Sequence, residues 1–173
     1  MTVKKPIANI NDVELRDWSK GSRFAARIAR IGPLVGAEQL GVQLQILAPG
    51  KAAYPRHAHH VNEEMFIVLE GEGTYRAGDQ TWATRTGDVI SAPAGTGETA
   101  HQITNTSDAE LKFLSISTRQ DPEVVEYPDS GKFAVMSRVP KDGGGLAAAL
   151  RFIGKAEDSL GYWDGEPGTE DGE

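Results

Sequence analysis

The chain has 173 residues, of which 39% are hydrophobic, and its formal net charge is −7. This length suits one domain with a core of its own. Cysteine is absent, which excludes disulfides, thiolate metal sites and cysteine nucleophiles. No basic patch is interleaved with aromatic residues, so nucleic-acid binding is not expected.

The negative charge is concentrated at the C-terminal end. Five acidic residues occupy the last ten positions, which leaves −2 for the rest of the chain. We interpret this segment as a solvated acidic tail. Residues 1–25 contain no apolar stretch typical of a secretory signal, and no run approaches transmembrane length. We therefore expect a cytoplasmic protein without membrane partners.

Short apolar segments separated by Gly and Pro follow one another along most of the chain. Residues 40–46 alternate apolar and polar side chains, as a half-buried strand does. Gly78-Asp79 is typical of a tight hairpin turn. Strands at roughly ten-residue spacing favour an antiparallel barrel or sandwich. The predicted strands cover 23–31, 40–46, 64–69, 74–77, 80–84, 89–92, 100–105, 110–118 and 132–139.

The C-terminal region has a different pattern. Residues 146–153 are rich in alanine and leucine and follow three consecutive glycines. Alanine and leucine have high helix propensity, so we predict a short helix here.

Two histidines and a glutamate have the spacing of a metal site. His57 and His59 are two apart, and in a strand such residues point to the same side. Glu64 opens the next apolar strand, where an unpartnered carboxylate is costly. Glu63 competes for this role, but it lies on the opposite strand face. Imidazoles with a carboxylate suit one divalent Zn, Fe, Mn or Ni ion with an open position for water or substrate.

The segment around these residues resembles the first motif of the cupin superfamily. That motif places a glycine, His-x-His, a glutamate and a glycine in order, here Gly50, His57, His59, Glu64 and Gly71. Six residues separate Gly50 from His57, one more than is usual in the family. Only Glu64 keeps the family's six-residue distance to Gly71, which favours it over Glu63.

A second segment resembles the second cupin motif. It contains Gly87, Pro93, Gly95, His101 and Asn105 in the family's order. The five residues between Gly95 and His101 exceed the usual two, which predicts a lengthened loop at the barrel mouth. The resemblance covers about residues 40–118.

The resemblance implies an all-β fold, the cupin double-stranded β-helix or jelly-roll barrel, with an N-terminal strand extension and a short C-terminal helix and tail. We expect residues 1–38 to pack on the barrel, 39–120 to form it, and 121–173 to be a C-terminal extension. It also implies a homodimer. The metal ligands it implies are His57, His59, Glu64 and His101, whereas His60 is expected at the surface or behind the ligands.

Other residues could contribute to a pocket, although each is more often plain core or surface. Arg56 and Glu98 flank the metal motifs and could orient a substrate, and Trp163 could cover the barrel mouth or a dimer seam. The candidate lining residues are Tyr54, Met65, Phe66, Trp82, Gln102 and Phe113.

The ligand set is compatible with several functions. One hypothesis is a metal-dependent isomerase or dioxygenase acting on a small polar metabolite in the barrel. The alternative is a metal-dependent protein that binds a sugar or carboxylate without turnover, because no acid–base pair is recognisable beyond the ligands. A metal-free structural barrel is the third. The catalytic residues, the metal and the substrate are not specified by the sequence, since this fold hosts many chemistries.

Overall fold

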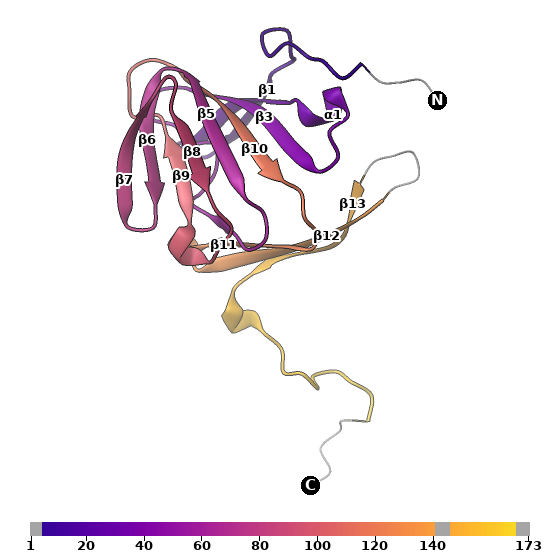
Figure 1. Ribbon diagram of the computed structural model, residues 1–173. Coiled ribbons are helices and arrows are strands. Elements are labelled where there is room, and N and C mark those ends of the chain that lie inside the picture. Colours follow the sequence, from indigo (N-terminus) through magenta and orange to yellow (C-terminus); the bar gives the residue numbers. More distant parts are fainter. Residues whose placement is uncertain (1–4, 141–145, 169–173) are drawn as a thin grey trace.

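The computed structural model describes residues 5–140 and 146–168, although the side chains of 139–140 and 146–149 are not among the described parts. It is built almost entirely of antiparallel strands (Figure 1). The strands are β1 (Arg16–Lys20), β2 (Phe24–Arg30), β3 (Leu40–Leu47), β4 (Ala58–His59), β5 (Glu64–Glu70), β6 (Glu72–Ala77), β7 (Gln80–Arg85), β8 (Val89–Ala92), β9 (His101–Thr104), β10 (Leu111–Thr118), β11 (Glu123–Tyr127), β12 (Lys132–Pro140) and β13 (Leu146–Gly154).

The helical elements are short and lie between strands or after the last one. They are α1 (Gly32–Val35), η1 (Gly97–Thr99), η2 (Pro128–Ser130) and η3 (Ala156–Asp158). η3 is a single turn that follows β13.

Three sheets form the molecule. One has the order β1-β2-β3-β10-β5-β8, the second β7-β6-β9, and the third β13-β12-β11-β4. The first two enclose the barrel, and the third passes beneath it (Figure 1). Sequence neighbours are often not sheet neighbours, as with β3, β10 and β5, and this is the jelly-roll arrangement predicted for the chain.

The inner face of the first sheet changes from apolar to polar along the barrel. On β10, Leu111 and Phe113 are buried core residues, and Ser115 and Ser117 follow at the same period of two. On the neighbouring strand β5, Val68 lies opposite Phe113 and Glu64 lies opposite Ser117, so this strand changes from apolar to polar in the same direction. The apolar end fills the core, and the polar end is therefore free to form a site.

The prediction of a helix over 146–153 is wrong. These residues belong to β13, which pairs with β12 over a register that places Val135 opposite Phe152. The rings of Phe133 and Phe152 contact each other with centroids 5.6 Å apart. Cross-strand pairing of this kind outweighs intrinsic helix propensity. The glycines at 143–145 lie outside the described residues.

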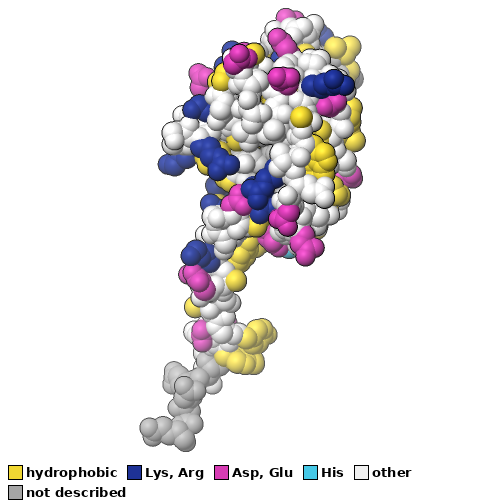
Figure 2. All heavy atoms as spheres, turned by 90° about the vertical axis from the view of Figure 1, so that its left-hand side faces the viewer, with side chains coloured by type: hydrophobic (Ala, Val, Ile, Leu, Met, Phe, Trp, Pro, Cys, Tyr) yellow, Lys and Arg dark blue, Asp and Glu magenta, His cyan; other side chains and the backbone are white. Residues whose placement is uncertain are grey.

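Beyond η3 the chain leads away from the barrel (Figure 1). Tyr162 and Trp163 are exposed there and pack edge to face with centroids 4.7 Å apart. Trp163 therefore does not cover the barrel mouth. Charges of both signs are interspersed on the face shown in Figure 2, and hydrophobic side chains gather on the tail. Acidic residues at 170, 171 and 173 lie outside the described part.

Among the described residues, no helix is long and apolar enough to cross a lipid bilayer.

Candidate metal centre

Backbone hydrogen bonds join the two sequence motifs at the polar end of the barrel. The N–H of His57 donates to the carbonyl of His101 at 3.1 Å, and the N–H of His101 donates to the carbonyl of His57 at 2.8 Å. Residues that exchange both bonds face each other directly across an antiparallel ladder, with side chains on the same face. The two imidazole centroids accordingly lie 4.8 Å apart.

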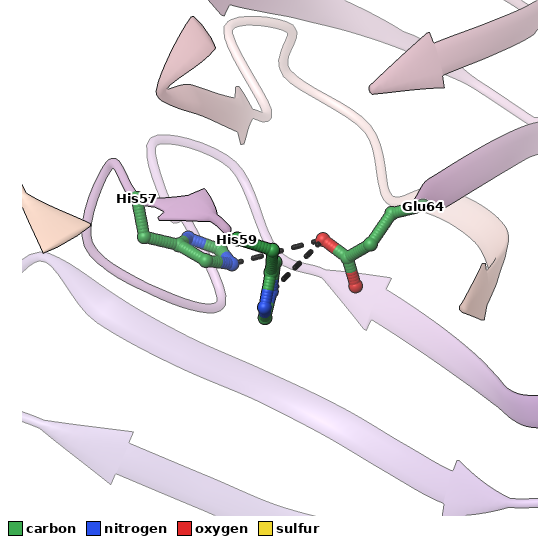
Figure 3. A group of neighbouring side chains, drawn as sticks. All are labelled: His57, His59 and Glu64. Atoms are coloured by element: carbon green, nitrogen blue, oxygen red, sulfur yellow. Dashed lines mark ion pairs between the residues drawn. The ribbon is translucent and has the colours of Figure 1, made fainter. Parts of the chain in front are cut away.

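Three imidazoles converge on one carboxylate oxygen. The Oε2 atom of Glu64 lies 3.7 Å from Nε2 of His57 and 3.6 Å from Nε2 of His59 (Figure 3). Nε2 of His101 lies 3.0 Å from the same oxygen. His57, His59 and Glu64 each offer a ligand atom within 4.8 Å of the others. The structure thus brings together all four residues that the sequence singled out.

His57 is held in one tautomer. Its Nδ1 lies 2.8 Å from the carbonyl oxygen of Pro55, which can only accept, so Nδ1 carries the hydrogen. The Nε2 atom of the neutral ring is then a bare acceptor directed at the site. Burial, followed by the neighbouring His101, lowers the pKa of His57 to about 4, so the ring is neutral at physiological pH.

His59 has an acidic neighbour on the side away from the site. Its Nδ1 lies 3.4 Å from Oε2 of Glu123, beyond the usual range for an N–H···O hydrogen bond but close for an ionic contact. Burial lowers the pKa of His59, but the carboxylates of Glu123 and Glu64 outweigh it, and the net pKa is raised. The contact favours a hydrogen on Nδ1, which leaves Nε2 to face Glu64.

Glu123 is one of the most deeply buried side chains, with 1% of its surface exposed. The side-chain amide of Asn62 donates to its Oε2 atom, and the N–H of Val61 donates to Oε1 at 3.5 Å. Burial raises the pKa of Glu123, but these contacts and His59 bring the net pKa below its ordinary value. A charged carboxylate therefore stands behind His59.

Asn62 is itself fixed by β10 and the segment after it. Its Oδ1 atom accepts from Thr118 Oγ1 at 2.9 Å and from the N–H of Gln120 at 2.6 Å. Its amide nitrogen also donates to the carbonyl of Gln120 at 3.1 Å. Every polar atom of this amide is used, which holds the Glu123 carboxylate in place.

Glu64 is charged in this environment. Burial raises its pKa, but the hydrogen bond from His101 and the other two imidazoles outweigh burial, so the net pKa is lowered. The buried Nδ1 of His101 has no hydrogen-bond partner among the described residues. His101 therefore interacts with the rest of the site through Nε2 alone.

The donor set fits a divalent transition metal. The neutral ring of His57 presents a bare Nε2 atom to the charged carboxylate of Glu64, and Nε2 of His59 faces the same oxygen. Imidazole nitrogens and a carboxylate oxygen directed at one point are the donors of His/carboxylate metal sites. Glu123 and the Pro55 carbonyl occupy the positions of the outer partners that orient metal-bound histidines.

The neighbouring candidates lie outside this cluster. Glu63 is exposed, and its N–H is bonded to Thr118 Oγ1 at 3.0 Å. His60 is at the surface, as expected, with Nε2 2.6 Å from Oε1 of Glu126. Arg56 is tied to Asp129 at 2.9 Å, and Glu98 is exposed in η1. Arg56 and Glu98 therefore do not line the site.

A cavity of about 250 Å³ adjoins the cluster. Of the pocket residues proposed from the sequence, Tyr54, Phe66, Gln102 and Phe113 line it. Met65 and Trp82 do not: they are 40% and 48% exposed. Met65 lies between Glu64 and Phe66 on β5, so strand alternation turns it outward.

Sequence reasoning missed two residues on β11. Glu123 supports His59, and Tyr127 lines the cavity with its ring stacked 6.2 Å from His57. Both share a strand face with Val125, because the three are spaced by two. The same spacing argument that selected His57 and His59 would have selected them, but the segment contains no motif to attract attention.

Comparison with known proteins agrees with this architecture. Residues 43–117 match the family model described as Cupin domain. Auxin-binding protein 1 of Arabidopsis thaliana is 30% identical over 131 residues, which are 71% of this chain and 64% of that protein. The chain thus spans slightly less than two thirds of this relative.

Solved structures extend the likeness over most of the chain. A sugar phosphate isomerase of the cupin superfamily from Silicibacter pomeroyi has a TM-score of 0.70 and 26% identity, covering 92% of this chain and 98% of that one. A protein from Acidithiobacillus ferrooxidans, described provisionally as a sugar phosphate isomerase, has a TM-score of 0.68 and 23% identity, covering 92% of this chain and 97% of that one. The second match shows the shared fold alone.

The buried neutral ring of His57 predicts a pH-dependent stability. The unfolded histidine has a pKa near 6.5 and the folded one a pKa of about 4, so the unfolded state binds more protons between these values. The metal-free protein should lose up to roughly 3 kcal/mol of unfolding free energy as the pH falls through this window. Urea unfolding at several pH values measures the slope.

His57→Asn should flatten that slope, and His60→Asn should keep it, because His60 lies at the surface. The raised pKa of His59 changes the unfolding free energy only above about pH 6.5, outside this window. A slope unchanged in His57→Asn would contradict the interpretation.

The Glu123 contact predicts a coupled titration. Glu123→Gln keeps the size of the side chain but removes its charge, so the pKa of His59 should fall relative to the wild-type protein. NMR titration of the imidazole resonances in metal-free protein measures this. Glu126→Gln, on the same strand and beside His60, should leave the His59 titration unchanged. Equal His59 titrations in the wild type and Glu123→Gln would refute the contact.

Proposed function

This chain belongs to the cupin superfamily, and from that premise we propose that it is a metal-dependent enzyme that isomerises a small polar metabolite held in the barrel. The observation that carries the proposal is the convergence of three imidazole nitrogens on one oxygen of Glu64, beside a cavity. The metal ligands we propose are His57, His59, Glu64 and His101.

Isomerisation is favoured over oxygen chemistry by the likeness to the isomerase of Silicibacter pomeroyi, which extends over 92% of the chain. Conversion of a hydroxy-carbonyl compound into its isomer moves a hydrogen between two neighbouring carbons. When bound, a divalent ion would polarise the carbonyl oxygen as a Lewis acid. The choice among Zn, Fe, Mn and Ni is left open by the donor set.

The residues of the cavity offer proton donors in addition to the proposed ligands. Tyr54 and Tyr127 line the cavity, and burial raises the pKa of each phenol. Both hydroxyls therefore keep their protons at neutral pH and can donate hydrogen bonds to substrate oxygens. Their rings flank His57 at centroid distances of 6.4 Å and 6.2 Å.

A second candidate is a binding protein without turnover. It is supported by the likeness to Auxin-binding protein 1 over 71% of the chain. It is also supported by the cavity lining, because the titratable side chains among its described residues are the proposed ligands and two tyrosines. A group poised as a general base is not among them.

The expected homodimer remains part of the proposal. The strand β13 lies at the edge of its sheet and carries the exposed apolar side chains of Leu150, Phe152 and Ile153. Exposed apolar edges are normally protected by pairing or cover, so a second copy of the chain is a suitable partner.

Protein purified without an affinity tag or chelator should contain about one equivalent of a divalent transition metal, because the four donors form a single site. Elemental mass spectrometry measures this. His57→Ala and His101→Ala should lose the metal, whereas His60→Ala should retain it. Circular dichroism must show that the variants are folded. Absence of metal even after reconstitution with Zn, Fe, Mn and Ni would overturn the proposal.

Turnover separates the enzyme from the binding protein. Metal-loaded protein incubated in deuterated water with aldoses and ketoses should introduce deuterium at the carbon that gains hydrogen, because the transferred proton exchanges with solvent. NMR of the recovered sugars detects this label, and protein with His57→Ala is the control. Binding of a sugar without deuterium incorporation or product would favour the second candidate.

A further inference from the structure

A strip of uncharged polar side chains lies on the cavity wall next to Glu64. It is formed by the inner faces of β3 and β10, where Ser115 pairs with Gln43 and Ser117 pairs with Gly41. Glu64 lies opposite Ser117 on the next strand, so the strip continues to the proposed metal ligands. We define the polar strip as Gln43, Gln45, Ser115 and Ser117.

Two members of the polar strip are buried, and Gln43 and Ser117 are half-buried. Gln45 is 3% exposed and Ser115 is 7% exposed, and both line the cavity. Among the described residues, neither side chain makes a hydrogen bond, whereas the equally buried Gln102 is bonded on both sides by Arg23 and Tyr54. The polar atoms of Gln45 and Ser115 are not among the fully enclosed unpaired atoms of the described residues, so they open onto the cavity and can be reached by a ligand. A ligand with hydroxyl groups would provide the missing partners.

The cavity offers little to bind a strongly charged anion. Its described lining contains no lysine or arginine, and Glu64 is its carboxylate. A divalent ion with Glu64 would leave a net charge of about +1. A phosphate dianion placed here would lose its hydration without a side-chain cation to replace it. Arg23 reaches the wall, but its guanidinium donates to Gln102 at 3.0 Å.

From these observations we infer that the cavity takes an uncharged, hydroxyl-rich carbonyl compound, a free sugar, in preference to a sugar phosphate. The inference rests on the proposed function, because the carbonyl end of the sugar would face the metal ligands while its hydroxyls meet the polar strip. The amides of Gln43 and Gln45 both donate and accept, as sugar hydroxyls do.

The shape of the cavity agrees with a small sugar. Its volume of about 250 Å³ is below the roughly 300–1,000 Å³ typical of pockets for drug-sized ligands. Gly41 leaves room beside Ser117, since a methyl group at this position would lie 2.6 Å from Ser117 Oγ. Tyr54 and Tyr127, from other segments, supply apolar ring surface for the C–H groups of a sugar.

Binding of matched ligand pairs tests the inference. Metal-loaded protein is titrated calorimetrically with D-ribose and D-fructose, and with the monophosphate ester of each. The free sugars should bind at least about tenfold more tightly than their esters, because the phosphate finds no lysine or arginine in the described cavity lining. Tighter binding of the esters, or no binding of any of the four compounds, would overturn the inference.

The polar strip is tested by variants that keep side-chain size. Gln45→Met and Ser115→Ala should each weaken binding of the free sugars by roughly five- to tenfold, because each removes hydrogen bonds to the ligand. Gln80→Met, on the exposed strand β7, should bind as the wild type does. Unchanged affinity in both folded strip variants would contradict the inference.

Metal content measured on the same samples separates the two proposals. Gln45→Met and Ser115→Ala should retain the wild-type metal stoichiometry, because neither residue is a proposed ligand. Wild-type protein that retains metal but binds phosphate esters more tightly refutes the sugar preference alone. Protein that takes up no metal refutes the proposed function, whatever it binds.

Discussion

The site depends on a pair of backbone hydrogen bonds between His57 and His101. These bonds connect two segments that are more than forty residues apart in the sequence and place their imidazoles on the same face. Glu64 on β5 pairs with Ser117 on β10, and this pairing holds its carboxylate beside the imidazoles. The side chains are thus positioned by main-chain pairing, which is more rigid than a loop.

The barrel combines stability and ligand binding by separating them along its axis. Leu47, Val68 and Leu111 are almost fully buried at one end, where apolar surface is removed from water. Two to four residues further along the same strands, Gln45, Ser115 and Glu64 face the cavity. Polar groups are therefore placed where a ligand can satisfy them, and the core that holds the strands contains none of the strip.

The sequence predicted the barrel and the four converging side chains because both leave a local pattern. Alternation revealed most strands, and His57, His59, Glu64 and His101 occupied motif positions. Residues 146–153 were misassigned because their composition favours a helix, while their actual conformation is decided by β12, which is a tertiary partner. Met65 and Trp82 were placed in the pocket by residue type, although strand alternation excludes Met65. Glu123 was missed because its segment contains no motif, and its contact with His59 forms only once β11 pairs with β4.

The placement of Glu123 has a consequence for how such a site can diverge. It lies outside the matched segment 43–117, as does Tyr127, yet the first contacts His59 and the second stacks on His57. The imidazoles and the groups that set their basicity are thus encoded in separate stretches of chain. Changes in β11 can retune the histidines while the motifs stay intact, so two relatives with identical motifs need not share the same histidine pKa values.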